Sequence, residues 1–563
     1  MNSPYAIRPF QRLFALLRMD RREIIYIYLF AFVRGGIMLS VPLGFQAIIN
    51  FISGGQMATS WGVMIAFVTI GVGLTGVMQV MELSLSEHIK QRLFVRSALE
   101  FAYRMPRIRT NSATGGYLPE LVNRFFDTMT VQKGLNKVLV DVPVASLQIL
   151  LGMILLSFYH PFFIGFAFFL ILLLYLIFRA TGRRGMETSL KESTFKYDTA
   201  FWLEELGRHT STFKMAGLSH LPMARADELA TGYTMARKGH FNVLLGYYWS
   251  MVGFKVVVTL ALLILGGMLV IGEQMNIGQF VAAEIIIILV INSVEKVILG
   301  LEAIYDVLTA LEKIGQVTDL PLETLEGLRM PVTIEDGGPM AVELQNVTFK
   351  STWSEVPVLE NIDLTFRAGE KVCISGHSGS GKSALLHLVA GLIDPSAGTI
   401  VLDGNGSRGL SLEDMRSAMG DSFTREEVFS GTILQNIIMG RSWVSEKDAR
   451  NAAERSGLMR LLRGIPQGLL TKLDPLGSRL PQGLVRRIII TRCIAGKPRL
   501  VLFEEDALSL PSQDKEEILA LLTGPEARFT LIAVSNDPQL QARCDRVVQL
   551  EQGRMKEERH NRI

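Results

Sequence analysis

Six apolar runs, separated by charged segments, dominate the first half of the chain. Each approaches the roughly 20 residues that an α-helix needs to cross a bilayer. The runs are Ile24–Ile49, Trp61–Leu83, Val138–Tyr159, Pro161–Arg179, Tyr247–Ile271 and Gly278–Leu299. This pattern predicts an α-helical transmembrane domain with six spans.

The segments between these runs alternate in length and charge. Phe51–Ser60 and Gly272–Ile277 are short and contain no Lys or Arg. The stretch after the second run is long and basic, with Lys90, Arg92, Arg96, Arg104, Arg107, Arg109 and Arg124. Because basic residues collect in cytoplasmic loops, we expect both termini and both long loops in the cytoplasm. The long loops are helix-compatible, so we expect membrane helices that continue beyond the bilayer and turn back.

The composition changes after Val317, where prolines and glycines mark a linker. Beyond it, short apolar runs predict buried parallel strands: Lys371–Ser375, Leu500–Phe503 and Thr530–Val534. Helical segments alternate with them, such as Lys447–Arg463 and Gln513–Leu522. The predicted domains are an N-terminal cytoplasmic segment (1–22), a transmembrane domain (23–317), a linker (318–340) and an α/β domain (341–563).

Composition supports a membrane protein, since 49% of the residues are hydrophobic and the mean hydropathy is +0.30. Lys and Arg number 57 against 54 Asp and Glu, which gives no reason to expect a nucleic-acid partner. The three cysteines, Cys373, Cys493 and Cys544, have neither disulfide-framework nor zinc-site spacing. We expect them to be buried thiols in a reducing cytoplasm. The first apolar run is too long for a cleavable signal.

One segment of the α/β domain carries a complete nucleotide-binding motif, GxxxxGK[ST], between an apolar strand and the apolar helix Ala384–Leu392. Its residues are Gly376, His377, Ser378, Gly379, Ser380, Gly381, Lys382 and Ser383. The glycines let backbone N–H groups surround phosphates at a helix N-terminus. Lys382 is expected to reach the β- and γ-phosphates, and Ser383 to ligate Mg²⁺. The sequence therefore predicts ATP and Mg²⁺ as cofactors.

Further motifs resemble those of the ABC transporter family, specifically half-exporters of the type I secretion and bacteriocin-export kind, over nearly the whole chain. The similar segments are Val358–Leu364, Phe429–Ile433 with Asn436 and Ile437, Arg486–Ile488 with Ala495, Lys497 and Pro498, Asp545–Val548 with Gly553, and, in the membrane half, Gly116–Leu118 with Arg124 and Asp127.

The resemblance implies an ABC exporter fold, that is, a six-span α-helical transmembrane domain fused to an α/β P-loop NTPase domain. It implies a homodimer or heterodimer with another half-exporter, embedded in membrane lipid in the bacterial inner membrane. It also suggests a periplasmic adaptor and an outer-membrane channel. Coupling loops near Met105–Gly116 and Leu203–Thr212 are expected to contact nucleotide domains.

The sequence departs from the family at most other nucleotide-site positions. The signature motif LSGGQ aligns with Leu480, Pro481, Gln482, Gly483 and Leu484. Pro481 supplies neither the hydroxyl nor the N–H that would contact the partner's ATP. Only Gly483 keeps a glycine role, so the contact with the partner's γ-phosphate is expected to be weak.

Other catalytic positions are also altered. Glu504 stands at the Walker B aspartate and would ligate Mg²⁺, while Glu505 aligns with the catalytic glutamate. Alternatively, the run Glu504–Asp506 is only an acidic strand end. The remaining alignments are Asn536 at the switch histidine, Thr424 at the Q-loop glutamine, Pro511 at the D-loop aspartate, and Ser351 at the adenine-stacking aromatic, with Trp353 nearby as a substitute or as an ordinary packing residue.

The phosphate-binding loop is thus intact while the groups that drive hydrolysis are changed. Because ground-state binding and transition-state stabilisation use different groups, we predict ATP·Mg²⁺ binding with slow or absent hydrolysis by this chain alone. The favoured function is an ATP-driven exporter subunit for an unidentified cargo, with peptide, protein, lipid and drug all open. The alternatives are a catalytically silent subunit that regulates or scaffolds a heterodimer, and a nucleotide-gated channel.

Charged residues inside or near the spans have two interpretations. They are Arg34, Lys255, Glu284, Glu295 and Lys296. Such charges are costly in lipid and need partners. They either line a polar translocation path or form ion pairs between helices, and the second interpretation is favoured.

Overall fold

The chain forms two compact units in the computed structural model. The structure describes residues 9–53, 59–109, 118–351, 354, 356–422, 428–474, 480–504 and 512–561, except for some side chains, chiefly those of 176–183. One unit comprises Met1–Arg107 and Gly116–Leu320, and the other comprises Ile108–Gly115 and Pro321–Ile563. The predicted domain boundaries at 317 and 340 lie on either side of the division between Leu320 and Pro321, and the predicted domain bounds stay predictions.

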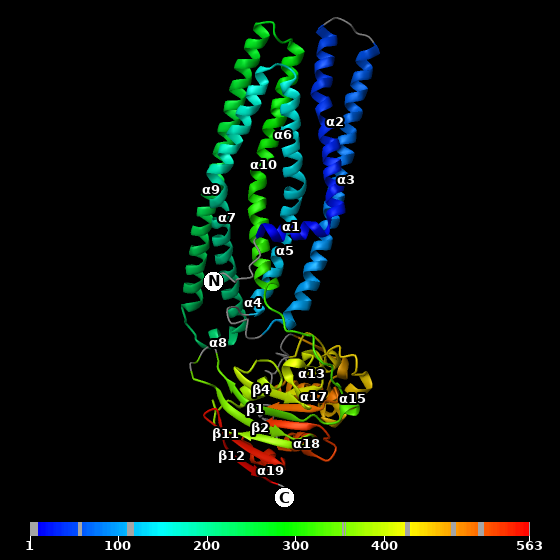
Figure 1. The fold of residues 1–563 in the computed structure, drawn as a ribbon, viewed down its shortest axis with the longest axis vertical. Helices are drawn as coiled ribbons and strands as arrows, with labels where there is room; N and C mark the ends of the chain where they lie inside the picture. Colours follow the sequence, from blue (N-terminus) through cyan, green and yellow to red (C-terminus); the bar gives the residue numbers. More distant parts are fainter. Residues whose placement is uncertain are drawn as a thin grey trace. The chain divides into compact units, whose positions relative to one another are not determined.

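The first unit is helical. Its α-helices are α1 (Pro9–Met19), α2 (Arg21–Ser53), α3 (Thr59–Arg104), α4 (Leu118–Val122), α5 (Asp127–Asn136), α6 (Val142–Ser157), α7 (Phe162–Arg208), α8 (Thr210–Met215), α9 (Leu221–Ile271) and α10 (Ile277–Thr318) (Figure 1). Short 3-10 segments at Met105–Arg107 and Asn123–Phe126 and a π-helical turn at Lys137–Asp141 connect some of them.

Among the described residues, five helical segments are long and apolar enough to cross a membrane: Arg21–Ile52, Trp61–Arg107, Leu118–Ser157, Leu221–Ile271 and Ile277–Thr318. The predicted fourth span falls in α7, whose described apolar part is Phe162–Tyr175. The 51 residues of α9 correspond to about 77 Å, more than twice the thickness of a hydrocarbon core. The length of α9 agrees with the prediction that membrane helices continue beyond the bilayer.

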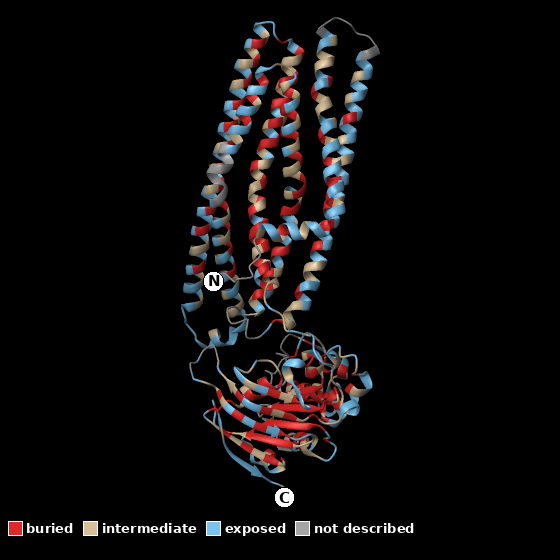
Figure 2. Ribbon diagram, viewed as in Figure 1, coloured by how far each residue is buried: buried red, intermediate tan, exposed pale blue. Residues whose placement is uncertain are grey.

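The helices of this unit differ in burial (Figure 2). In the most apolar 18-residue stretch of α10, half of the residues are buried, whereas in the corresponding stretch of α3 only 6% are buried. The buried side of α10 packs with α6, α7 and α9 through residues such as Phe163, Phe254 and Ile286. Helices α2 and α3 expose apolar side chains such as Phe32 and Phe67, as lipid-facing helices do.

Charged residues of the spans form ion pairs between helices. Lys255 on α9 lies 2.6 Å from Glu295 on α10. Arg34 on α2 lies 3.0 Å from Glu82 on α3, whose side chain is only 1% exposed. For these residues the structure agrees with the favoured interpretation, in which the charges join helices.

The second unit is an α/β domain with two main sheets. The six-stranded sheet has the order β12 (Arg554–His560), β11 (Arg546–Glu551), β3 (Lys371–Ser375), β10 (Thr530–Val534), β9 (Leu500–Glu504) and β6 (Met419–Ser422). The four-stranded sheet has the order β2 (Leu359–Phe366), β1 (Val342–Phe349), β4 (Ala397–Leu402) and β5 (Asn405–Gly406). A small ribbon pairs β7 (Gly431–Thr432) with β8 (Lys472–Leu473).

The α-helices of this unit are α11 (Ile334–Gly337), α12 (Lys382–Val389), α13 (Leu412–Ser417), α14 (Ile433–Ile438), α15 (Glu446–Arg455), α16 (Leu458–Leu461), α17 (Gln482–Ala495), α18 (Ser512–Thr523) and α19 (Pro538–Arg543).

Most predicted elements of this unit are confirmed. The three predicted strands are β3, β9 and β10, and they pair in parallel at the centre of the six-stranded sheet. One helix prediction, Lys447–Arg463, is wrong in extent, because the helix ends at Arg455 and Gly457 adopts a left-handed φ of 74°. All three cysteines are buried thiols outside any disulfide bond, as predicted.

Candidate nucleotide-binding site

The phosphate-binding loop joins the carboxyl end of β3 to the first turn of α12. Strand β3 is almost wholly buried, which fixes the point at which the loop leaves the sheet. Gly376 has a φ of 149°, and a Cβ there would lie 2.2 Å from the carbonyl oxygen of Leu550, so only glycine fits. Gly381 ends the loop as the left-handed N-cap of α12. The first N–H groups of α12 and the helix dipole therefore favour an anion at this loop.

Lys382 is held against the loop that it follows. Its ammonium group donates hydrogen bonds to the carbonyl oxygens of Gly376 and His377, each at 2.8 Å, and to Ser380 Oγ at 3.4 Å. This arrangement places the positive charge at the loop, where a phosphate group would replace the carbonyls as its acceptor.

Ser383 and Glu504 lie together, as the predicted metal ligands should. The Ser383 hydroxyl donates a 2.5 Å hydrogen bond to Glu504 Oε1. Glu504 reaches this position because β9, which it ends, lies one strand away from β3 across β10. A hydroxyl and a carboxylate are oxygen ligands that suit Mg²⁺.

The protein part of this ligand set is small. In the described parts of the chain, no group of three or more His, Cys, Asp or Glu could hold a metal ion. Magnesium commonly takes one or two protein ligands and completes its coordination with phosphate oxygens and water. Ser383 and Glu504 therefore fit an ion that arrives with a nucleotide.

Asn536 contacts the first residue of the loop with both ends of its amide. Its Oδ1 accepts from the Gly376 N–H at 3.0 Å, and its Nδ2 donates to the Gly376 carbonyl oxygen at 3.1 Å. The residue follows β10, the strand next to β3. Sequence reasoning placed Asn536 at the nucleotide but missed this contact with the loop. Its position after a parallel strand adjacent to β3 was the available signal.

One histidine lies beside the metal-ligand pair. His387 is on α12, one turn after Ser383. Burial lowers the pKa of its imidazole, and the nearby carboxylate of Glu504 acts in the opposite direction. Sequence reasoning did not single out this residue.

The signature segment forms the start of α17. Pro481 is the N-cap of this helix, and no side chain caps it. Pro481 and Gln482 are exposed, Gly483 is half-buried, and Leu480 is partly buried against an apolar core that α17 forms with α14, α15 and α16. Leu484 is 6% exposed and lies within that core. Leu484, which aligns with the fifth signature position by family resemblance, is thus a packing residue.

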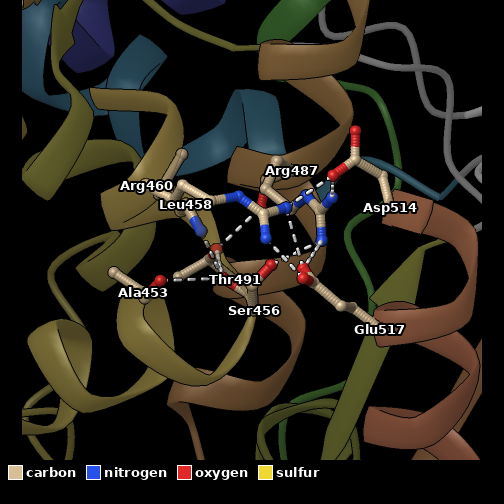
Figure 3. A network of polar contacts seen from close by, with 8 residues as sticks. All are labelled: Ala453, Ser456, Leu458, Arg460, Arg487, Thr491, Asp514 and Glu517. Atoms are coloured by element: carbon tan, nitrogen blue, oxygen red, sulfur yellow. Dashed lines mark hydrogen bonds and ion pairs between the residues drawn. The ribbon is translucent and has the colours of Figure 1, made fainter. Parts of the chain in front are cut away.

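Arg487, a residue of α17 itself, anchors this helix through a network of polar contacts (Figure 3). The Arg487 side chain is fully buried, lies 2.9 Å from Asp514 Oδ1 on α18, and donates to the Ser456 carbonyl oxygen at 2.6 Å. Arg460 shares Asp514 at 2.6 Å and also pairs with Glu517.

Hydroxyl groups extend this network. Ser456 Oγ lies 2.7 Å from Thr491 Oγ1, and Thr491 donates to the Arg487 carbonyl oxygen at 2.7 Å (Figure 3). The network joins α17, α18 and the segment after α15. Sequence reasoning used Arg487 only for family resemblance, although an arginine beside the apolar run Ile488–Ile490 signals a buried, paired charge.

Some predicted site residues cannot be placed. Trp353, Thr424, Glu505 and Pro511 lie outside the described residues. Ser351 follows β1, and its carbonyl oxygen accepts from the Ser354 N–H at 3.3 Å. The catalytic role of Glu505 and the adenine contact therefore stay predictions.

Known proteins resemble this chain in both halves. Residues 359–507 match the profile of the ABC transporter family. A solved structure of a bacterial Atm1-family ABC exporter with ATP bound superposes with a TM-score of 0.80, covering 96% of this chain and 95% of that one at 18% identity. The chain therefore has the fold of an ABC exporter half-transporter, and the predicted fold class is confirmed.

Curated relatives carry more specific names. An ATP-dependent lipid A-core flippase of Burkholderia orbicola is 26% identical over 565 residues, which cover 95% of this chain and 91% of the relative. A flippase of the same name from Syntrophus aciditrophicus is 27% identical, over 53% of this chain and 49% of the relative. A probable ABC transporter ATP-binding/permease protein of Haemophilus influenzae is 31% identical, over 38% of each chain.

Proposed function

We propose that this chain is the ATP-binding subunit of a dimeric ABC exporter in the bacterial inner membrane, with both termini cytoplasmic. Its cargo is an amphiphilic lipid, and its own site binds ATP·Mg²⁺ but hydrolyses it slowly. The observation that carries this proposal is the contrast within one domain. Lys382, Ser383 and Glu504 are assembled around the phosphate-binding loop. By family resemblance, Pro481 aligns with the signature serine and Asn536 with the switch histidine, two groups that take part in hydrolysis.

The binding half of the proposal follows from these contacts. Lys382 and the N–H groups at the start of α12 would hold the phosphates, and Ser383 with Glu504 would hold the magnesium ion, which shields phosphate charge when bound. The Asn536 amide is neutral and is engaged with Gly376, so it supplies no cation to a developing charge. Pro481 offers the partner's nucleotide no hydroxyl and no N–H.

The cargo assignment rests on the relatives. The two reported relatives that align over 95% and 53% of this chain are both named ATP-dependent lipid A-core flippases, which favours a lipid over the peptide or protein expected from the type I secretion resemblance. The reported relatives give no support for a periplasmic adaptor or an outer-membrane channel, and the proposal needs neither.

Nucleotide titration and steady-state hydrolysis on the full chain in lipid nanodiscs test the proposal. We expect saturable binding of a fluorescent ATP analogue with Mg²⁺ and turnover well below the typical enzyme value of about 10 per second. Glu505→Gln should lower any residual turnover without weakening binding. Absence of binding would exclude the ATP-binding role, and rapid turnover by the chain alone would contradict the impaired site.

A second candidate is a catalytically silent subunit of a heterodimer. Pro481 favours it, because in a dimer this residue faces the partner's phosphate-binding loop by family resemblance. Co-purification with a half-exporter that has a complete signature, Walker B aspartate and switch histidine would support this candidate. Transport of a fluorescent lipid by the chain as a homodimer would exclude it.

A further inference from the structure

The second unit, which contains the nucleotide site, begins twice along the chain, at Ile108 and at Pro321, and these two starting segments are paired with each other. Ile108 and Leu322 form an antiparallel β-bridge, and the Arg109 N–H donates to the Pro321 carbonyl oxygen at 3.2 Å. The Arg109 guanidinium adds bonds to the Leu322 carbonyl oxygen at 3.2 Å and to Thr324 Oγ1 at 3.1 Å. The first cytoplasmic loop is thus tied to the start of the linker.

The same linker segment is joined to the end of the phosphate-loop helix. Both carboxylate oxygens of Glu323 accept from Arg416, at 2.6 and 2.9 Å, and the Glu323 side chain is only 11% exposed. Arg416 also donates to the carbonyl oxygens of Gly391 at 2.6 Å and Ala390 at 3.4 Å. Ala390 is the C-cap of α12, where unpaired carbonyls and the helix dipole favour a cation.

Two further sets of hydrogen bonds hold the linker. The Leu328 N–H donates to the Gly409 carbonyl oxygen at 2.8 Å, and the Ser411 N–H donates to the Leu328 carbonyl oxygen at 3.0 Å. The 3% exposed Arg499 donates to the carbonyl oxygens of Gly337 and Gly338, at 2.9 and 2.7 Å.

The contacts of Arg499 and Arg416 with the linker involve the two elements that build the nucleotide site, β9 and α12. Arg499 immediately precedes β9, whose last residue is the predicted metal ligand Glu504. Arg416 contacts the end of α12, whose first residues are Lys382 and Ser383. The linker is therefore attached at the start of the strand that ends in Glu504, and at the C-terminal end of the phosphate-loop helix α12.

We propose that residues 321–338, the linker strap, couple the first cytoplasmic loop to nucleotide binding, with Arg416 as the positioning residue. The inference rests on the proposed ATP binding at the loop Gly376–Ser383. A phosphate that draws in the first turn of α12 moves the whole short helix, and with it the carbonyls that Arg416 contacts. Arg416 passes this movement to Glu323 and so to the segment paired with Ile108 and Arg109.

A cavity of about 390 Å³ lies beside the linker strap, lined by residues that include Thr324, Glu326, Leu388, Leu392 and Met415. Coupling between two sites is reciprocal. The factor by which bound nucleotide changes the equilibrium between two positions of the cytoplasmic loop therefore equals the factor by which the loop position changes nucleotide affinity.

Hydrogen exchange on the full chain in nanodiscs, with and without a non-hydrolysable ATP analogue and Mg²⁺, tests the inference. In the wild type we expect the nucleotide to slow exchange in residues 321–330. Glu323→Gln removes the strap's carboxylate while leaving the bonds of Arg416 to α12 intact, so it should abolish this protection. Nucleotide affinity should fall about 5-fold or more in Glu323→Gln, the lower end of typical coupling.

Conservative variants separate coupling from folding. Arg416→Lys keeps the charge but cannot serve the carboxylate and both carbonyls together, so its protection should be intermediate, and Arg416→Gln should resemble Glu323→Gln. Arg408→Gln is the matched control, because this exposed arginine makes one long bond to the Pro395 carbonyl oxygen at 3.4 Å. It should behave as the wild type.

The outcomes are distinct. If the wild type binds no nucleotide, the proposed function fails. If it binds nucleotide but residues 321–330 exchange at the same rate with and without it, the strap inference fails while the proposed function stands. Nucleotide-dependent protection that persists in both Glu323→Gln and Arg416→Gln also overturns the inference.

Discussion

Helices α12 and α17 both begin where a domain of this fold is expected to meet nucleotide, and their first turns differ. Gly381 precedes α12, and Lys382 lies folded against the glycine loop. Pro481 precedes α17, and no side chain caps either helix. A phosphate would find N–H groups and a cation at α12, but at α17 it would meet an exposed proline.

The two helices also differ in how they are held behind these turns. Helix α12 packs into the apolar core through Leu385, Leu386 and Val389. Helix α17 is fixed by the fully buried charge of Arg487 in addition to apolar contacts. The comparison teaches that a helix that begins with an exposed proline, without a glycine loop and lysine, can still be held by a buried polar network, so the support of a helix and the chemistry at its N-terminus are separable.

Breaking the support of α17 should have the largest effect. Arg487→Met removes the ion pair with Asp514 and leaves the buried Ser456 carbonyl oxygen without its donor, while Arg460 still pairs with Asp514 and Glu517. We expect a loss of about 3 kcal/mol in the free energy of unfolding. Denaturant unfolding of the nucleotide-binding domain, followed in the full chain, measures it. Arg463→Met, at an exposed position of the same domain, should change stability little. An equal loss in both variants would show that the network does not stabilise α17.

Removing the cation of α12 should have the next largest effect. Lys382→Ala loses charge-assisted hydrogen bonds to phosphate, typically worth about 1.5–3 kcal/mol, so nucleotide affinity should fall about 10- to 150-fold. Titration with a fluorescent ATP analogue measures the change. Lys472→Ala, at an exposed lysine on β8, serves as the control. Unchanged affinity in Lys382→Ala would remove the loop from the binding site.

Repairing the start of α17 sharpens the comparison. A serine at the N-cap can accept a backbone N–H, so Pro481→Ser should be about 1 kcal/mol more stable than Pro481→Ala. If the proline also limits catalysis, Pro481→Ser should raise ATP turnover in the dimer, and Pro481→Ala should not. Equal stability and equal turnover of the two variants would show that the missing cap has no consequence.

The smallest expected effect is a pH dependence centred on α12. Because the folded pKa of His387 is lowered, the unfolded chain takes up a proton near pH 6.5 while the folded domain resists it. Stability contributed by the neutral imidazole should therefore be lost as pH falls below about 6.5. Thermal unfolding between pH 7.5 and 5.5 should show a smaller decline in His387→Gln than in the wild type. Parallel declines would assign the effect to other groups.

Part of this architecture was predictable because it depends on local sequence. The strand Lys371–Ser375, the glycine loop and the following helix occupy adjacent residues, so their order alone indicates a phosphate site. The long apolar runs likewise predict membrane helices without knowledge of their neighbours. The helix prediction Lys447–Arg463 failed because one glycine turned the chain, which a periodic pattern does not register.

The sequence by itself determined that this protein has membrane-spanning helices and a glycine loop built for phosphate, since both follow from residues close together in the chain. Only the tertiary structure decided what those elements contact. The Asn536 amide meets Gly376 across 160 residues, and Arg416 meets Glu323 across 93. Such pairs exist because parallel strands and a folded linker bring distant side chains together, and no spacing in the sequence specifies which polar groups will satisfy one another.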